Sequence, residues 1–472
     1  MADEPWTGDA CSLVEAYRSG TITPPEALDA CYAAIEHSDL NAFSHLDPDQ
    51  ARQDAEAADV SLPFGGVPIG VKELEPVAGW PFTEASLVFA DRIADVTATM
   101  VERLRASGAV LAGQTTSSEF GGVNCTHTRL HGTTRNPWQL DRTPGGSSGG
   151  TAAAVAGGLL PIATGSDGGG SIRIPAGFTG MFGLKATYGR IPRGPRVAQN
   201  PLTVVSGCVS RSVRDTARWF DVCNGADERD TLSLPRVEGW EAGLGTHGDE
   251  LRGLRAAVVV DLGAAAVNEE VAAVVVAGAE ALIADAGMSR VETKLVLPEA
   301  GFEWAISNAV VLLDELGDSY PDCEQDLTPE IQFILNVASR QFTLRMAASV
   351  EGFRVAVNES MADAFDDVDI VFAATNPDVA FNAEGPLPTT VGGRDLVAEL
   401  GFEKALGNNG ALTIPANLSG NPAVSIPVGT VDGLPVGMQV IARHHAEELL
   451  LDLALLAERE RPWPLVAPGS PH

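Results

Sequence analysis

A chain of 472 residues, of which 45% are hydrophobic and 20% charged, has the balance of a globular protein, which excludes a disordered or fibrous chain. Its formal net charge of −32 would repel a phosphate backbone, so we expect no binding of nucleic acid. The acidic start and the lack of about 18 consecutive apolar residues predict a soluble, cytoplasmic protein without a membrane segment.

The predicted elements alternate between helices and short strands. In chain order, helices are expected over 10–18, 24–36, 48–59, 97–107, 151–157, 213–223, 268–286 and 446–460, and strands over 67–72, 110–113, 160–164, 256–260 and 369–374. The segments 412–418, 423–427 and 436–442 are interpreted as strands or turns. Thr23 and Asp47, each followed by a proline, and Ser212 are the expected N-caps. This alternation predicts an α/β fold.

The segment from 298 to 366 is expected to be mainly helical and carries bulky apolar residues, among them Phe302, Trp304, Phe333, Ile334 and Phe342. Such residues ordinarily pack in a core, and the alternative interpretation is a wall over a substrate pocket. No internal repeat or low-complexity linker divides the chain. We therefore expect one domain over 1–472, with a variable, mainly helical substrate-pocket region over about 298–400.

Two glycine-rich loops, 145–150 and 166–171, are the first candidates for chemistry. In the second loop Ser171 follows Gly168, Gly169 and Gly170, whose missing side chains let backbone N–H groups turn toward one point. A single loop of this kind is ordinarily a tight turn. However, Ser147 in the first loop precedes Ser171 by 24 residues, with a helix and a strand between them. Both loops are therefore expected at one edge of a sheet, where ligands of α/β proteins bind.

Lys72 closes the apolar strand predicted over 67–72, and it is one of only four lysines among 31 basic residues. A lysine has an ordinary pKa of about 10.4, and burial lowers that value, so a buried lysine can act as a base near neutral pH. Taken alone, Lys72 would be interpreted as a surface residue at the end of a strand.

Three segments together resemble the amidase signature: Gly-Gly-Ser-Ser-Gly-Gly-Thr-Ala-Ala-Ala over 145–154, Gly-Gly-Ser-Ile-Arg-Ile-Pro-Ala over 169–176 and Gly-Met-Phe-Gly-Leu-Lys-Ala-Thr over 180–187. The 75 residues that separate Lys72 from Ser147 fit the same family. A weaker resemblance extends over most of the chain, including 415–423 and 433–440. The resemblance implies a single α/β/α sandwich with a mixed central sheet covered by helices on both faces.

The resemblance also implies a role for each residue of the loops. Ser171 would attack the carbonyl, Ser147 would relay the proton on a cis peptide with Gly146, and neutral Lys72 would be the base. The backbone N–H groups of Gly168, Gly169, Gly170 and Ser171 would form the oxyanion hole. Asp167 and Arg173 would brace this loop, and Ser148 would form a hydrogen bond near the relay.

The chain departs from the family pattern at two places. Many relatives have Asp-Asn after the lysine, where this chain has Glu73 and Leu74, and a β-branched residue is common at the position of Gly168. These changes leave the Ser-Ser-Lys triad intact and leave the identity of the substrate open.

Other interpretations of the same loops remain open. The segment 145–149 also matches the G-x-S-x-G elbow of α/β-hydrolases, with His444 or His445 as its histidine, although the preceding 136–144 looks like a loop rather than a strand. The chain could instead be the amidase subunit of a tRNA-dependent amidotransferase. A phosphate-binding role is disfavoured by the negative charge and by the lack of the P-loop G-K-[ST].

The six cysteines are scattered, and no cysteines and histidines are grouped at metal-ligand spacing, so we expect no disulfide framework, no metal and no cofactor. Cys125, His127 and His131 are expected to be structural, the alternative being that they border the site.

Taken with the resemblance, the sequence predicts a stand-alone amidase whose partner is a small-molecule amide, apolar or aryl, with esters and carbamates as related substrates. Its oligomeric state is left open, with a homodimer as one option.

Overall fold

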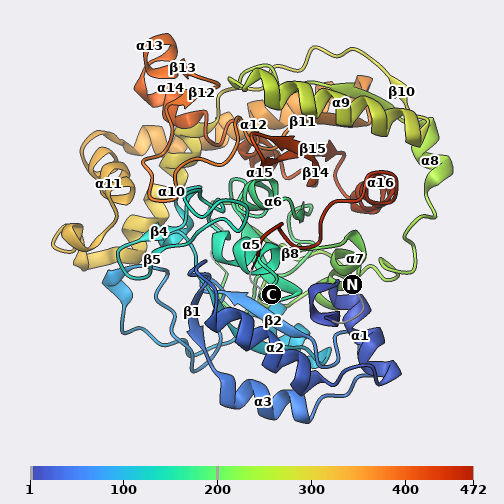
Figure 1. Cartoon of the computed structure of the whole chain (residues 1–472). Coiled ribbons are helices and arrows are strands. Elements are labelled where there is room, and N and C mark those ends of the chain that lie inside the picture. Colours follow the sequence, from blue (N-terminus) through green and yellow to red (C-terminus); the bar gives the residue numbers. More distant parts are fainter. Residues whose placement is uncertain (1–3, 198–200, 471–472) are drawn as a thin grey trace.

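A mixed sheet of eleven strands runs through the centre of the protein (Figure 1). The computed structural model describes residues 4–197 and 201–470, so the first residues of the acidic start lie outside the described part. From one edge to the other the strands are β1 (Phe43–Leu46), β3 (Val110–Thr115), β2 (Pro68–Lys72), β6 (Ile162–Asp167), β8 (Val205–Ser210), β7 (Phe182–Lys185), β14 (Ala423–Val431), β15 (Leu434–Ala442), β11 (Ile370–Ala374), β9 (Arg255–Val258) and β10 (Ser289–Arg290). The predicted mixed α/β sheet is confirmed.

Helices surround this sheet (Figure 1). They are α1 (Ala10–Ser19), α2 (Pro24–Glu36), α3 (Pro48–Glu56), α4 (Thr99–Ala106), α5 (Gly149–Ala156), α6 (Arg173–Thr179), α7 (Val213–Cys223), α8 (Gly248–Gly253), α9 (Glu269–Ala286), α10 (Gly301–Leu316), α11 (Pro329–Gln341), α12 (Leu344–Asp367), α13 (Leu396–Leu400), α14 (Phe402–Gly407), α15 (Ile414–Ser419) and α16 (Glu447–Glu460). Short 3-10 turns lie at Pro5–Thr7, Leu87–Phe89, Glu119–Gly121, Gly317–Ser319 and Glu324–Asp326. Two small hairpins pair β4 (His127–Thr128) with β5 (Gly132–Thr133) and β12 (Thr390–Val391) with β13 (Arg394–Asp395). In the described part of the chain no helix is long and apolar enough to cross a membrane.

The two faces of the sheet carry separate hydrophobic cores. Ile162 of β6 belongs to the large core that α7, α9 and α16 complete, whereas its neighbour Ala163 belongs to a smaller core with α5 and α6. Cys208 and Val209 of β8 divide in the same way. Because successive side chains of a strand point to opposite faces, helices cover both faces of the sheet, as in a sandwich.

The topology of three strands places the glycine loops. β2 runs parallel to both β3 and β6, so the carboxyl ends of β2 and β6 lie at the same edge of the sheet. The backbone N–H of Lys72 donates to Thr164 Oγ1 over 2.7 Å, which fixes the two strands side by side. Lys72 and the loop that follows Asp167 therefore meet at this edge.

The predicted helix caps are present. Thr23 and Glu26 form a capping box at the start of α2, Asp47 accepts the N–H of Gln50, and Ser212 accepts the N–H of Asp215. Asp215 has a second contact that the sequence did not indicate. Its buried carboxylate accepts the N–H groups of Ala10 and Cys11, both over 2.9 Å, and thereby caps α1 as well.

Some predicted boundaries were wrong. The helix expected over 48–59 ends at Glu56, because Asp59 accepts the N–H of Ser61 and turns the chain. The segment 412–418, interpreted as a strand or turn, instead contains most of the short helix α15, Ile414–Ser419. The strand expected over 160–164 is β6, which starts at Ile162 and continues to Asp167. The sequence also missed β1, β7, β8 and α6.

Candidate active site

Lys72 is fully buried and forms a hydrogen bond with the first glycine loop. Its Nζ donates to Ser147 Oγ over 2.7 Å. The same Nζ donates to Ser166 Oγ over 3.0 Å. Ser166 received no role in the sequence analysis, although its place on β6 beside β2 puts it next to the lysine. The lysine is thus held between two hydroxyl groups.

The surroundings of Lys72 favour its neutral form. Burial lowers the pKa of Lys72 below its ordinary 10.5, and the carboxylates of Glu75 and Asp167 partly oppose this effect. Burial acts in the other direction on the acid, since it raises the pKa of Glu75 above 4.5. A lysine whose pKa is depressed in this way can accept a proton from a neighbouring hydroxyl at a pH near neutral.

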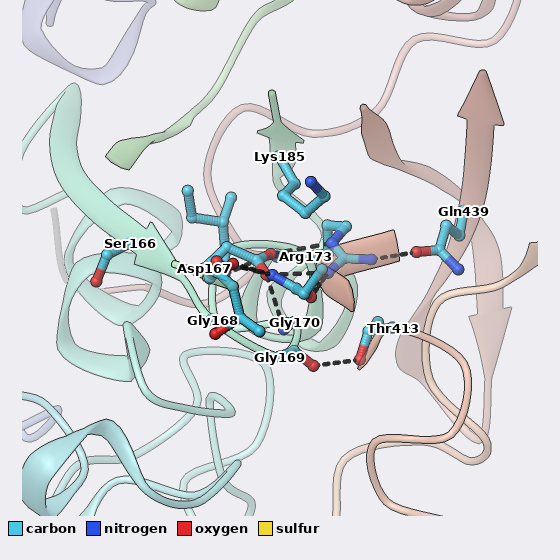
Figure 2. Close-up of polar contacts among 12 residues, drawn as sticks. Ser166, Asp167, Gly168, Gly169, Gly170, Arg173, Lys185, Thr413 and Gln439 are labelled. Atoms are coloured by element: carbon cyan, nitrogen blue, oxygen red, sulfur yellow. Dashed lines mark hydrogen bonds and ion pairs between the residues drawn. The ribbon is translucent and has the colours of Figure 1, made fainter. Parts of the chain in front are cut away.

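The second glycine loop is braced by a buried ion pair (Figure 2). Arg173 Nε lies 2.9 Å from Asp167 Oδ2, and its Nη2 lies 2.9 Å from Oδ1. Both side chains are fully buried. Arg173 also donates to Gln439 Oε1 and Asn417 Oδ1, over 2.5 and 2.6 Å. Burial alone would raise the pKa of Asp167, but the guanidinium and the hydrogen bonds hold it well below its usual range, so the carboxylate stays ionised.

Residues from other segments hold the backbone of the glycine loop, and Figure 2 shows the contact between Thr413 and Gly169. The carbonyl of Gly168 accepts Trp304 Nε1 over 2.8 Å, and the carbonyl of Gly169 accepts Thr413 Oγ1 over 2.6 Å. The N–H of Gly170 donates to Asp167 Oδ1 over 2.8 Å. Neither Trp304 nor Thr413 was assigned to this loop from the sequence, because both come from segments outside the signature.

One of the four N–H groups expected in the oxyanion hole has another partner in the structure. The expectation named Gly168, Gly169, Gly170 and Ser171, but the N–H of Gly170 is already taken by the Asp167 carboxylate. Within residues 4–197 and 201–470, the structure shows no acceptor for the N–H groups of Gly168, Gly169 and Ser171. These three groups are the donors left for an oxyanion.

The two glycine loops touch each other. The N–H of Ser148 donates to the carbonyl of Ser171 over 3.3 Å, and Ser148 Oγ donates to the carbonyl of Ser166 over 3.4 Å. The Gly146–Ser147 peptide is cis, as the resemblance implied. Ser147 is buried, whereas Ser171 is partly exposed. Ser171 is thus the more accessible of the two serines, while Ser147 lies deeper, beside the lysine.

Apolar side chains stand next to these loops. A Cβ on Gly169 would lie 2.9 Å from the Trp304 ring, and one on Gly121 would lie 3.2 Å from Leu74 Cδ1 and 3.4 Å from Ser147 Oγ. A Cβ on Gly122 would lie 2.6 Å from Ile331 Cδ1 of α11.

A surface cavity of about 540 Å³ lies between α4 and the loop after α7, and none of the catalytic candidates lines it.

The segment predicted from 298 to 366 is mainly helical, and its bulky apolar residues differ in burial. Trp304 and Ile334 are partly buried against apolar clusters, as in ordinary core packing. Phe302 and Phe333 instead keep 42% and 48% of their surface exposed. Only Trp304 among the aromatic residues of this segment is bonded to a glycine loop in the described part of the chain.

Of the remaining candidates, Cys125 borders the first glycine loop, because a Cβ on Gly146 would lie 2.8 Å from its backbone N, and the histidines have other partners. His444 Nε2 is 2.8 Å from the carbonyl of Ser419, and His445 Nδ1 is 3.3 Å from Arg190 Nη2, so the geometry gives no support to a histidine-based elbow at Ser147. Cys125 is buried and unpaired. Two other histidines have local partners: His127 Nδ1 lies 2.8 Å from Thr133 Oγ1, and His131 Nε2 lies 3.2 Å from Glu73 Oε2. In the described part of the chain no group of three or more His, Cys, Asp or Glu side chains could hold a metal ion.

Comparison with protein families and curated proteins gives matches along nearly the whole chain. The model of the amidase family matches residues 26–451. The chain is 31% identical to an acylamidase of Rhodococcus erythropolis, over 96% of this chain and 95% of that protein. It is also 30% identical to one subunit of the glutamyl-tRNA(Gln) amidotransferase of Lacticaseibacillus paracasei, over 97% of this chain and 98% of that protein.

Two solved structures have the same fold to different degrees. A bacterial aryl acylamidase of the amidase signature family superposes with a TM-score of 0.88 at 28% identity, covering 98% of this chain and 97% of that one. The corresponding subunit of the glutamyl-tRNA(Gln) amidotransferase of Thermotoga maritima superposes with a TM-score of 0.74 at 25% identity, covering 95% and 94%. The backbone is thus more similar to the aryl acylamidase than to the amidotransferase.

Proposed function

The chain belongs to the amidase signature family of hydrolases that act on carbon–nitrogen bonds, and from this membership we propose that it is a stand-alone amidase of apolar or aryl carboxylic amides. Ser171 is the nucleophile, Ser147 the proton relay and Lys72 the base. The observation that carries the proposal is the 2.7 Å hydrogen bond between the Ser147 hydroxyl and the Nζ of a fully buried lysine.

The proposed reaction proceeds through an acyl-enzyme. Ser171 Oγ attacks the amide carbonyl carbon, its proton passes to Ser147 Oγ, and the proton of Ser147 passes to neutral Lys72. The N–H groups of Gly168, Gly169 and Ser171 stabilise the resulting oxyanion. The C–N bond then breaks as Lys72 returns a proton through Ser147 to the leaving nitrogen. Water, deprotonated by the same relay, hydrolyses the ester on Ser171 and releases the carboxylic acid.

The proposed substrate class rests on the surroundings of the serines. Trp304 lies against Gly169 of the second loop, and Leu74 and Ile331 lie beside Gly121 and Gly122, the turn that approaches Ser147. The higher TM-score with the aryl acylamidase, 0.88 against 0.74 for the amidotransferase, points the same way. Esters and carbamates of similar shape should also react, because their hydrolysis passes through a similar oxyanion.

A substrate panel tests this proposal. The purified chain is assayed with anilides, aliphatic amides, carbamates, esters and glutamine, and the anilides or other apolar amides should give the highest kcat/KM. Ser171→Ala should abolish turnover, and Lys72→Ala should nearly do so while the fold is retained. Hydrolysis of apolar amides by Ser171→Ala, or wild-type rates at neutral pH for Lys72→Ala, would contradict the assigned roles.

A second candidate function is the glutaminase subunit of a tRNA-dependent amidotransferase. It is favoured by 30% identity to such a protein over 97% of the chain. The panel separates the two candidates, because this function requires hydrolysis of glutamine in preference to anilides. It also requires that a partner subunit increase the glutaminase rate.

A further inference from the structure

Trp304 binds the second glycine loop from outside the family signature. It lies in the first turn of α10, where its backbone N–H donates to the carbonyl of Ala300. Its indole Nε1 donates to the carbonyl of Gly168 over 2.8 Å, and its ring packs so closely on Gly169 that a Cβ there would lie 2.9 Å from Cε2. The indole therefore fixes the Gly168–Gly169 peptide by one hydrogen bond and by direct packing.

The direction of that carbonyl determines the direction of an oxyanion donor. The Gly168–Gly169 peptide is trans, so its C=O and its N–H point in opposite directions. With the Gly168 carbonyl held by Trp304, the N–H of Gly169 must point away from the indole. In the described part of the chain this N–H has no acceptor, which leaves it available to an oxyanion.

The next peptide of the loop is held differently. The carbonyl of Gly169 accepts Thr413 Oγ1, and the N–H of Gly170 donates to Asp167, so the Gly169–Gly170 peptide is bonded at both ends. The Gly168–Gly169 peptide is bonded only at its carbonyl. Glycine has the widest choice of backbone conformation, so a peptide between two glycines can rotate once its single anchor is lost.

We propose that Trp304 is a positioning residue of the oxyanion hole: its indole N–H holds the Gly168 carbonyl and thereby aims the N–H of Gly169 at the oxyanion. The inference rests on the proposed reaction at Ser171. An oxyanion hole accelerates a reaction because its donors are oriented before charge develops, so loss of orientation slows the chemical step more than it weakens substrate binding.

Two substitutions separate the hydrogen bond from the bulk of the ring. Trp304→Phe retains an aromatic ring and loses the N–H. Trp304→His loses the outer ring but can keep an N–H at the same place, because imidazole Nε2 corresponds to indole Nε1 in its distance from the Cβ atom. We expect Trp304→Phe to lower kcat about 10- to 100-fold with KM changed less than about twofold, since removing an oxyanion donor outright costs about 100- to 1,000-fold. Trp304→His should recover a large part of this loss.

A transition-state analogue gives an independent measurement. A trifluoromethyl ketone forms a tetrahedral adduct with the serine and carries the oxyanion, so its Ki should rise in Trp304→Phe by the same factor by which kcat/KM falls. The affinity for the carboxylic acid product, which carries no such oxyanion, should stay within about twofold. Both variants are compared by thermal unfolding, so that kcat refers to folded enzyme.

Trp240→Phe is the matched control. Trp240 Nε1 donates to the carbonyl of Val237 over 2.9 Å, which is the same kind of bond in the loop after α7. This variant should keep kcat, KM and the Ki of the ketone.

Three results would overturn the inference. Equal kcat in Trp304→Phe and wild type, in an assay where Ser171→Ala is inactive, would refute the positioning role and leave the proposed function intact. A raised KM with unchanged kcat would make Trp304 a wall of the substrate site instead. If Trp304→Phe does not fold, Trp304→His still tests the inference. A folded Trp304→His that loses as much kcat as is expected for Trp304→Phe would show that an N–H at this position does not orient the loop.

Discussion

Ser166 Oγ lies 3.0 Å from Lys72 Nζ, on the strand that runs parallel to the one bearing the lysine. Together with Ser147 Oγ at 2.7 Å, it gives the buried lysine a second hydroxyl partner. A hydroxyl that accepts a hydrogen bond stabilises the ammonium form more than the neutral amine. We therefore expect the hydrogen bond to Ser166 to oppose part of the lowering of the Lys72 pKa that burial causes.

Ser166→Ala should shift the acidic limb of the pH–rate profile to lower pH. Loss of the hydroxyl removes a bond to the charged form, so the pKa of Lys72 falls further and the neutral base persists at lower pH. A hydrogen bond to a charged group is worth about 1.5–3 kcal/mol and one pKa unit is about 1.4 kcal/mol, so we expect a shift of about one to two pH units. The measurement is kcat/KM against pH. The control is Ser107→Ala, at the end of α4, and a shift to higher pH would contradict the assignment.

Asp167→Asn should destabilise the protein because it leaves Arg173 buried without a counter-charge. Breaking one partner of a buried pair costs about 3–5 kcal/mol. The pKa of Asp167 is held below its usual value in the folded protein. The Asp167 carboxylate therefore stabilises the fold fully at any pH above the ordinary carboxylate pKa. This stabilisation is lost only as the pH falls through the lower pKa of the folded protein. Chemical denaturation at pH 7 measures the loss of stability, and a series from about pH 5 down to about pH 1 shows where the difference between Asp167→Asn and wild type narrows.

The control for Asp167→Asn is an exposed ion pair. Asp95→Asn removes the partner of Arg196, which lies at the surface, and should leave the denaturation midpoint unchanged. A loss in Asp167→Asn no larger than in Asp95→Asn would show that the buried pair does not brace the loop.

Lys185→Met should raise stability at neutral pH. Lys185 is fully buried near Arg173 (Figure 2), and burial, assisted by Arg173, lowers its pKa to about 7. Between pH 7 and the ordinary 10.5 the unfolded chain binds the proton that the folded chain lacks, so the wild type gains stability as pH rises through this window. Lys185→Met lacks this gain. The difference in the free energy of unfolding between Lys185→Met and wild type should therefore shrink by roughly 3 kcal/mol between pH 7 and pH 10.

Denaturation curves at pH 7, 8.5 and 10 test the Lys185 prediction. Lys404→Met, which removes an exposed lysine, is the control, and its curves should run parallel to those of the wild type. The prediction fails if the difference between Lys185→Met and wild type does not change with pH.

The sequence predicted the parts of the fold and site that depend on local pattern. Apolar strands next to glycine loops, and caps such as Thr23 and Ser212, are set by neighbouring residues, so they could be found along the chain. The segment 412–418 could not be assigned, because a short apolar run fits a strand and a buried helix equally well. In the structure Pro415 stands in the first turn of α15, and Gly420 ends it with φ of +81°.

The parts of the site that the sequence missed are held by long-range contacts. Trp304 and Thr413 meet the glycine loop across 136 and 244 residues of chain, and neither lies in a motif. The bond from Gly170 to Asp167 was missed for a different reason. The expected strand ended at Thr164, so Asp167 was placed within the loop rather than at the end of β6, where its carboxylate can accept backbone N–H groups of the following turn.

A buried carboxylate in the 3-10 turn Glu119–Gly121 joins the start of α11 to Ser86. Glu119, only 1% exposed, accepts both the N–H and the hydroxyl of Thr328, the N-cap of α11, over 2.7 and 2.6 Å, and its other oxygen accepts Ser86 Oγ. Burial raises the pKa of Glu119, and the bonds from Thr328 oppose that rise. Ile331 beside Gly122 follows within the first turn of this helix, so the carboxylate fixes an apolar wall next to the loops.

Glu119→Gln should loosen α11 while it leaves the triad in place. An amide can retain one acceptor oxygen but directs an N–H₂ donor at Thr328 or Ser86, so at least one bond is lost, at a cost of about 1–3 kcal/mol. Hydrogen exchange of 328–341 should accelerate, and KM for apolar amides should rise more than kcat falls, because the wall moves and the serines do not. The control is Glu359→Gln, which removes the same negative charge from an exposed position on α12. Unchanged exchange in α11, or a fall in kcat with KM unaltered, would contradict the view that Glu119 acts through the helix it holds.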